Sequence, residues 1–286
     1  MVLKPLLFGV MLPAVISGVV LLIGNRAGEG SGRRWASSLA IGLACIGGYW
    51  GVIGLPPFLP IEASQWLFYL VGVAIVVGGL NGSSRVPAWV RWTLNLLLVA
   101  LTSWLLVRPL LQYSWQGVGG ILRLVGVIGG FLAFWFFLHR LLLSASAAVW
   151  NTATLCIIAT TTSVVLVLSG SALLGQLGGV LTASVGAVVV LAWRLPAISL
   201  ARSGTAVIAI WLGGLLLAGY LYAAVPITSL ILLILSPAAA WVGHLPYFKS
   251  ARPWQRALVQ LAAVSAPAIL AVVLAIDISA GGDYGY

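Results

Sequence analysis

The stretch that decides the fold is residues 204–224, GTAVIAIWLGGLLLAGYLYAA, which contains no charged residue. A helix of about 20 apolar residues matches the roughly 30 Å hydrocarbon core of a bilayer, so this run predicts a transmembrane helix. Similar runs recur along the 286-residue chain, in which 62% of residues are hydrophobic and 6% are charged, with a mean hydropathy of +1.16. Soluble domains have about 25% charged residues. We therefore expect an all-α polytopic integral membrane bundle, with residues 1–286 forming a single transmembrane helical domain and no soluble domain.

Ten candidate spans follow from these runs, each bounded by a charge, a proline or a cluster of Gly, Ser or Asn. The ninth is the weakest, because Pro237 interrupts it, and nine or eleven spans stay open as alternatives. The expected spans are residues 6–23, 35–55, 62–80, 89–107, 118–138, 147–168, 172–193, 204–224, 227–241 and 257–278.

The basic residues predict the orientation of the bundle, because loops kept in the cytoplasm carry an excess of Lys and Arg. With ten spans, eleven basic residues fall on one side and three on the other, which places both termini on the non-cytoplasmic side. Arg outnumbers Lys by twelve to two, and Ala, Gly and Trp are abundant. This usage is typical of a GC-rich bacterial genome, so we expect the inner (plasma) membrane. The cytoplasmic set is Arg26, Arg33, Arg34, Arg85, Arg91, Arg140, Arg194, Arg202, Lys249, Arg252 and Arg256; the opposite set is Lys4, Arg108 and Arg123.

Few residues are available for chemistry. The chain has four carboxylates, two histidines and two cysteines, with no HExxH, GxGxxG or P-loop pattern and no acidic pair for Mg²⁺. We therefore expect no catalytic residue, no metal site and no cofactor, and an enzyme is disfavoured. The net charge of +10 does not indicate nucleic-acid binding, because the basic residues are dispersed between apolar runs.

The most distinctive loop is residues 51–66, GVIGLPPFLPIEASQW, between the second and third expected spans. Glu62 falls in the first turn of the next helix, where the helix dipole favours a carboxylate, so one interpretation is a structural cap. The alternative pairs Glu62 with Arg108 or Arg123 to form a gate or ligand site. Arg123 lies inside an apolar run, where a charged side chain needs a partner.

Polar residues inside the spans predict a candidate pathway lining, most of it in the sixth span. Ser and Thr side chains also bond back to the carbonyl four residues earlier, so helix packing is the competing interpretation. The candidate lining residues are Asn95, Asn151, Thr152, Thr160, Thr161 and Gln176.

Glycine pairs at GxxxG spacing predict close helix contacts, because small residues let backbones approach in lipid. Such pairs occur at Gly47 and Gly51, at Gly126 and Gly130, and at Gly175 and Gly179. Packing within one bundle is the first interpretation, and dimerisation is the second.

Two functions fit these features. The first is a transporter or permease for a small neutral, amphipathic or anionic solute, without its own ATPase. The alternative is a non-catalytic structural subunit or scaffold of a larger membrane protein complex. The expected partners are the lipid bilayer and either a second copy of the chain or other membrane subunits, with no nucleic acid.

Overall fold

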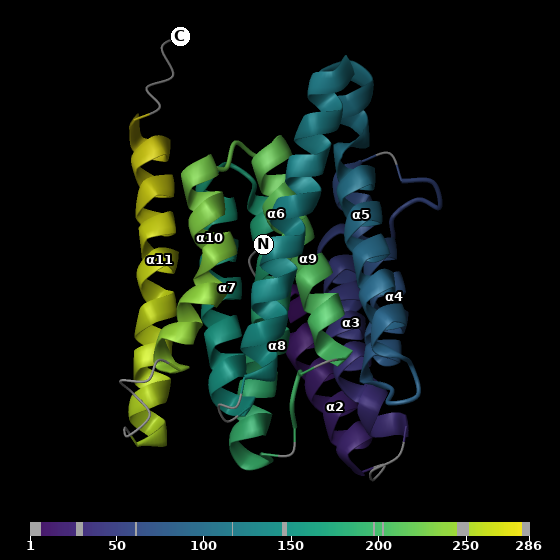
Figure 1. Ribbon diagram of the computed structural model, residues 1–286, viewed down its shortest axis with the longest axis vertical. Helices are drawn as coiled ribbons and strands as arrows, with labels where there is room; N and C mark the ends of the chain where they lie inside the picture. The colour runs from purple at the N-terminus through teal and green to yellow at the C-terminus, as the bar shows by residue number, and fades with distance from the viewer. Residues whose placement is uncertain are drawn as a thin grey trace.

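The computed structural model describes residues 7–26, 31–60, 62–115, 117–144, 148–196, 198–201, 203–244 and 252–281. Every regular element in these ranges is helical, which confirms the predicted all-α class. The helices lie side by side in one bundle (Figure 1). They are η1 (Leu7–Met11), α2 (Leu12–Arg26), α3 (Ser31–Ile53), α4 (Ala63–Gly82), α5 (Ala88–Tyr113), α6 (Gly117–Leu143), α7 (Ala148–Leu168), α8 (Ala172–Arg194), α9 (Ser203–Tyr222), α10 (Ile227–Ala239), η2 (Ala240–His244) and α11 (Pro253–Gly281).

Nine helices in the described ranges are long and apolar enough to cross a membrane, so their length and composition fit a multi-pass membrane bundle. The tenth element, α10, is shorter. It has 13 residues, which at 1.5 Å per residue cover only about 20 Å of a roughly 30 Å core. Pro237 lies inside α10, and three residues later the chain tightens into the 3₁₀ turn η2. The sequence predicts that Pro237 interrupts this span, and the α-helix indeed ends at Ala239, just after the proline.

Helix α9 forms the centre of the bundle. All of its residues from Ser203 to Gly219 are buried, as expected for a helix that is apolar on every face. Trp211 is fully buried and donates its indole N–H to the carbonyl of Leu177 in α8 at 3.0 Å. The run that predicts a membrane span therefore forms a core that is in contact with α3 to α8 and with α10.

Two of the three predicted glycine pairs lie in helix contacts. Gly47 of α3 faces Ile16 of α2, and Gly175 of α8 faces α7. The pair in α6 differs, because a Cβ at Gly126 or Gly130 would meet no atom within 4 Å beyond the local helix backbone. These two glycines therefore border open space instead of a neighbouring helix.

Helix α5 extends past the end that the sequence predicts. The expected span is 89–107, yet α5 continues through Pro109 to Tyr113. Proline removes a backbone N–H and obstructs the carbonyl four residues earlier. One turn away, the Tyr222 hydroxyl of α9 donates to the carbonyl of Leu106 at 2.6 Å, which fastens α9 to this part of α5. Because α5 continues to Tyr113, the tip of the hairpin formed by α5 and α6 extends beyond the ends of neighbouring helices (Figure 1).

Candidate functional site

Glu62 lies at the N-terminus of α4 and is exposed. Its backbone N–H donates to the Gln65 side chain at 3.3 Å, and the Ser64 hydroxyl donates to its carboxylate at 3.4 Å. The first of these bonds and the contact of the Gln65 backbone N–H with the Glu62 side chain form a capping box. Glu62 also lines a cavity of about 380 Å³, together with Pro109 and Tyr222. The carboxylate thus has a local structural role at the edge of a small cavity.

The two candidate arginines are both exposed, and each guanidinium lies over an indole ring. Arg108 lies 5.5 Å from the ring centre of Trp104, and Arg123 lies 5.4 Å from that of Trp115. Arg123 lines a different cavity from Glu62. The structure therefore does not bring the three predicted gate residues into a single cavity.

Asn95 is buried and forms an amide pair with Asn81 of α4. The Asn81 amide donates to the Asn95 carbonyl oxygen at 2.9 Å, and the reverse bond is 3.4 Å. Two buried amides that satisfy each other avoid the cost of unpaired polar groups. Asn95 therefore joins α4 to α5.

Asn151 belongs to a second polar cluster. The sequence predicted Asn151 as a polar candidate but not its partner Gln260. Gln260 of α11 is buried and donates to Asn151 at 3.2 Å and to the Thr154 hydroxyl at 3.1 Å. Ser144 also donates to the Asn151 side chain at 3.2 Å. The sequence offers one signal for this cluster that was not used, which is the single amide, Gln260, in the apolar run 257–278. This cluster links α7 to α11.

The remaining lining candidates have local partners or face outward. The hydroxyls of Thr152, Thr160 and Thr161 each donate to the carbonyl four residues earlier, at 2.7, 2.8 and 2.9 Å. Thr160 and Thr161 also border an apolar hollow of about 440 Å³. Gln176 is exposed near the start of α8.

Replacing Gln260 with leucine is expected to destabilise the protein by about 1 kcal/mol, because interhelical hydrogen bonds in membrane proteins contribute about 0.6 kcal/mol on average and up to about 1.7. Thermal unfolding in detergent measures the effect. Gln176→Leu is the matched control, since Gln176 is exposed, and it should leave the midpoint unchanged. Equal midpoints for the two variants would contradict a stabilising role for the α7–α11 cluster.

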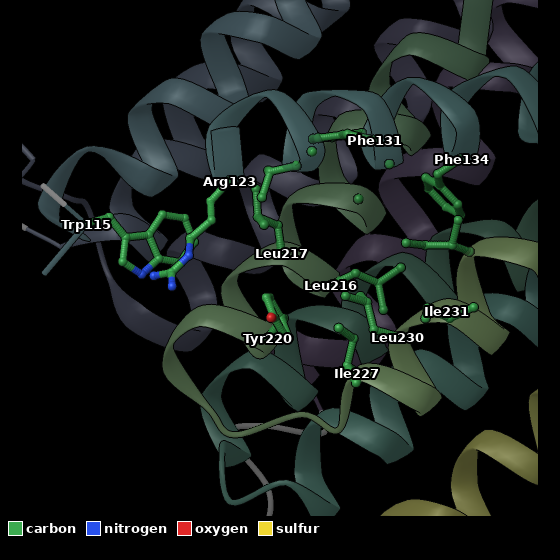
Figure 2. A pocket seen from close by; sticks show the side chains of 15 residues that line it. Trp115, Arg123, Phe131, Phe134, Leu216, Leu217, Tyr220, Ile227, Leu230 and Ile231 are labelled. Carbon is green, nitrogen blue, oxygen red and sulfur yellow. The ribbon is translucent and has the colours of Figure 1, made fainter. Parts of the chain in front are cut away.

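A cavity of about 580 Å³ lies between α6, α9 and α10 (Figure 2), and we name it the α6 groove. Its size falls within the roughly 300–1,000 Å³ typical of small-molecule sites. The groove is mostly apolar. It is lined by Trp115, Arg123, Gly126, Val127, Gly130, Phe131, Phe134, Gly213, Leu216, Leu217, Tyr220, Ile227, Leu230, Ile231 and Ile234.

The groove exists because α6 presents glycine where it faces α10. Side chains at Gly126 and Gly130 would occupy the space, and no neighbour fills it in their place. Further along, α6 and η2 are in contact, since the rings of Phe137 and Trp241 lie 5.8 Å apart. Helix α6 therefore contacts η2 near Phe137, whereas a gap separates it from α10 near Gly126 and Gly130.

Arg123 gives the groove a positive end. Among its described lining residues, Arg123 alone carries a charge. The described ranges contain two carboxylates, Glu62 and Asp277, and neither lines the groove. The Trp115 ring attracts the guanidinium by a cation–π interaction, worth about 0.5–1 kcal/mol at exposed sites, but leaves its positive charge in place. Figure 2 shows this pair at one end of the groove, away from Phe131 and Phe134. The arrangement suits a ligand that is apolar along its length and anionic at one end.

The sequence singled out Arg123 and the α6 glycines but did not connect them, and it missed Trp115 and Tyr220 as lining residues. In the described part of the chain, no group of three His, Cys, Asp or Glu residues could hold a metal ion. Comparison of the sequence with known protein families and with curated proteins gives no match.

Proposed function

We propose that this chain is a ten-span transport protein without its own ATPase, which takes an amphipathic anion into the α6 groove. The observation that supports this proposal is an apolar cavity of about 580 Å³ whose one charged lining residue, among those described, is Arg123. Binding energy comes from burial of the apolar part of the solute. Selectivity comes from charge-assisted hydrogen bonds between the guanidinium and an anionic group.

The arginine distribution supports an orientation for this transporter. In a ten-span arrangement, α10 and η2 together form the ninth crossing, and both termini lie on the non-cytoplasmic side of a bacterial inner membrane. Arg123 lies near the α5–α6 connection, on the side with few basic residues. The charged end of the groove then faces the non-cytoplasmic interface, and the solute is loaded from that side.

The test is uptake by liposomes that contain the purified full chain. Three amphipathic dyes of similar size are compared: an aryl sulfonate, a neutral analogue and a quaternary ammonium analogue. We expect uptake of the sulfonate only. Arg123→Gln should reduce it about tenfold or more, since a hydrogen bond to a charged group contributes about 1.5–3 kcal/mol.

Arg108→Gln is the matched control, because Arg108 is also an exposed arginine over an indole ring but does not line the groove. This variant should transport the sulfonate at the wild-type rate. Equal losses in the two variants, or equal uptake of all three dyes, would refute the proposed solute site.

A scaffold role is the second candidate, and one observation favours it. Helix α6 is largely exposed, and a Cβ at Gly119 or Gly129 would meet no atom within 4 Å beyond the local helix. Glycine faces of this kind let a partner helix approach closely. If Gly129→Leu dissociates a co-purifying subunit and no dye is taken up, the scaffold role replaces transport.

A further inference from the structure

The depth of the α6 groove matches one leaflet of a bilayer. Its lining residues on α6 run from Arg123 to Phe134, which at 1.5 Å per residue is roughly 16 Å of helix. Half of a typical hydrocarbon core is about 15 Å. Phe131 and Phe134 are buried at the inner end. With Arg123 at the interfacial level, a groove of this length extends to about the middle of the membrane.

The groove is accessible from the lipid-facing side of the bundle. Ile227 and Ile231 of α10 are 55% and 48% exposed, and Gly126 on the opposite wall is also exposed. Its floor is buried, as at Leu216 and Phe134. An apolar chain can thus enter sideways between α6 and α10 without leaving the hydrocarbon.

The shape of the groove disfavours a transmembrane helix as its occupant. A helix with its side chains is about 10–12 Å wide and needs about 20 residues to cross the core. The Phe137–Trp241 contact brings α6 and η2 together beyond the inner end of the groove. A straight helix would meet this contact, whereas an acyl chain of one leaflet would end before it.

The outer end of the groove has the chemistry of a phosphate site. Arg123 offers a planar set of N–H donors that suits phosphate oxygens. Trp115 lies beneath it, and tryptophan is enriched at the level of lipid headgroups. Tyr220 also lines the groove, and Figure 2 shows it near the Arg123 end.

We propose that the α6 groove binds an anionic phospholipid from the non-cytoplasmic leaflet, with its phosphate at Arg123 and one acyl chain along Gly126 and Gly130. This inference rests on the proposed function, because it identifies the amphipathic anion as a membrane lipid. The absence of side chains at the two glycines sets the width available to the chain, and Arg123 sets the preference for negative charge.

Native mass spectrometry of the detergent-purified full chain tests the proposal. The protein is incubated with dioleoyl phosphatidylglycerol or dioleoyl phosphatidylcholine, which have the same chains and differ in net charge. We expect one retained phosphatidylglycerol and weaker retention of phosphatidylcholine, because its choline cation is repelled by Arg123 although its phosphate is the same. Glycerol phosphate, which has no acyl chain, should not displace the bound lipid.

Four variants locate the lipid. Arg123→Gln and Gly130→Leu should each lose phosphatidylglycerol, while the controls Arg108→Gln and Gly129→Leu should keep it. Equal retention of both lipids, displacement by glycerol phosphate, or unchanged binding in Arg123→Gln and Gly130→Leu would overturn the inference. It would also be overturned by a dimer that Gly130→Leu dissociates, because a second copy would then occupy the groove.

Failure of the inference can be distinguished from failure of the proposed function. If phosphatidylglycerol binds with this pattern but the aryl sulfonate is not taken up, the lipid site stands and the transport role fails. If uptake of the sulfonate depends on Arg123 while no lipid is retained, transport stands and the lipid assignment fails.

Discussion

Leucine at both Gly126 and Gly130 is expected to make the protein more stable and to abolish uptake of the amphipathic sulfonate. A glycine inside a helix is about 1 kcal/mol less favourable than a good helix former, and each substitution removes this cost. No atom beyond the local helix lies within 4 Å of the Cβ position at either site. The new side chains therefore extend into the α6 groove and fill the space that the solute needs.

This result would separate folding from function, because most inactivating substitutions also destabilise a protein. Thermal unfolding in detergent and liposome uptake are measured on the same preparation. Gly129→Leu is the control: it replaces a neighbouring glycine that also borders open space but does not line the groove. That variant should show the gain in stability and the wild-type rate of uptake. Full uptake by the Gly126/Gly130 double variant would rule out the groove as the solute site.

The helical class was predictable because bilayer thickness fixes the length of an apolar run. The central span expected at 204–224 corresponds to α9, Ser203–Tyr222, within two residues at each end. The end of α5 was not predictable in the same way. Arg108 and Pro109 are ordinary signals for a helix end, and the contact near them comes from Tyr222, more than 100 residues further along the chain.

The candidate site was predictable only as separate residues. Arg123 stood out because charge is rare in an apolar run, and Gly126 and Gly130 because of their spacing. Their common role depends on which helices lie opposite α6, and hydrophobic periodicity contains no information about helix neighbours. The same limit applies to Asn151, whose polarity was visible in the sequence but whose partner Gln260 is 109 residues away.

Alanine at Gly78 is expected to destabilise the protein by about 1–3 kcal/mol, the usual cost of forcing extra atoms into a packed core. A Cβ at Gly78 of α4 would collide with the backbone carbonyl oxygen of Ser203 in α9, and it would lie 2.9 Å from the Cβ of Ser38 in α3. A side chain could rotate away from such a contact, but a backbone oxygen moves only if α4 and α9 separate. Since α9 is the core of the bundle, the loss should extend beyond the local turn.

Gly72→Ala in the same helix is the control with the opposite expected sign. A Cβ at Gly72 would meet no atom within 4 Å beyond the local helix, so alanine there should stabilise the protein by up to about 1 kcal/mol. Both variants gain the same methyl group and the same intrinsic helix propensity. The difference between their unfolding midpoints in detergent therefore isolates the close approach of α4 to α9. Equal midpoints would mean that the two helices are not in contact at Gly78, and the central position of α9 would then be wrong.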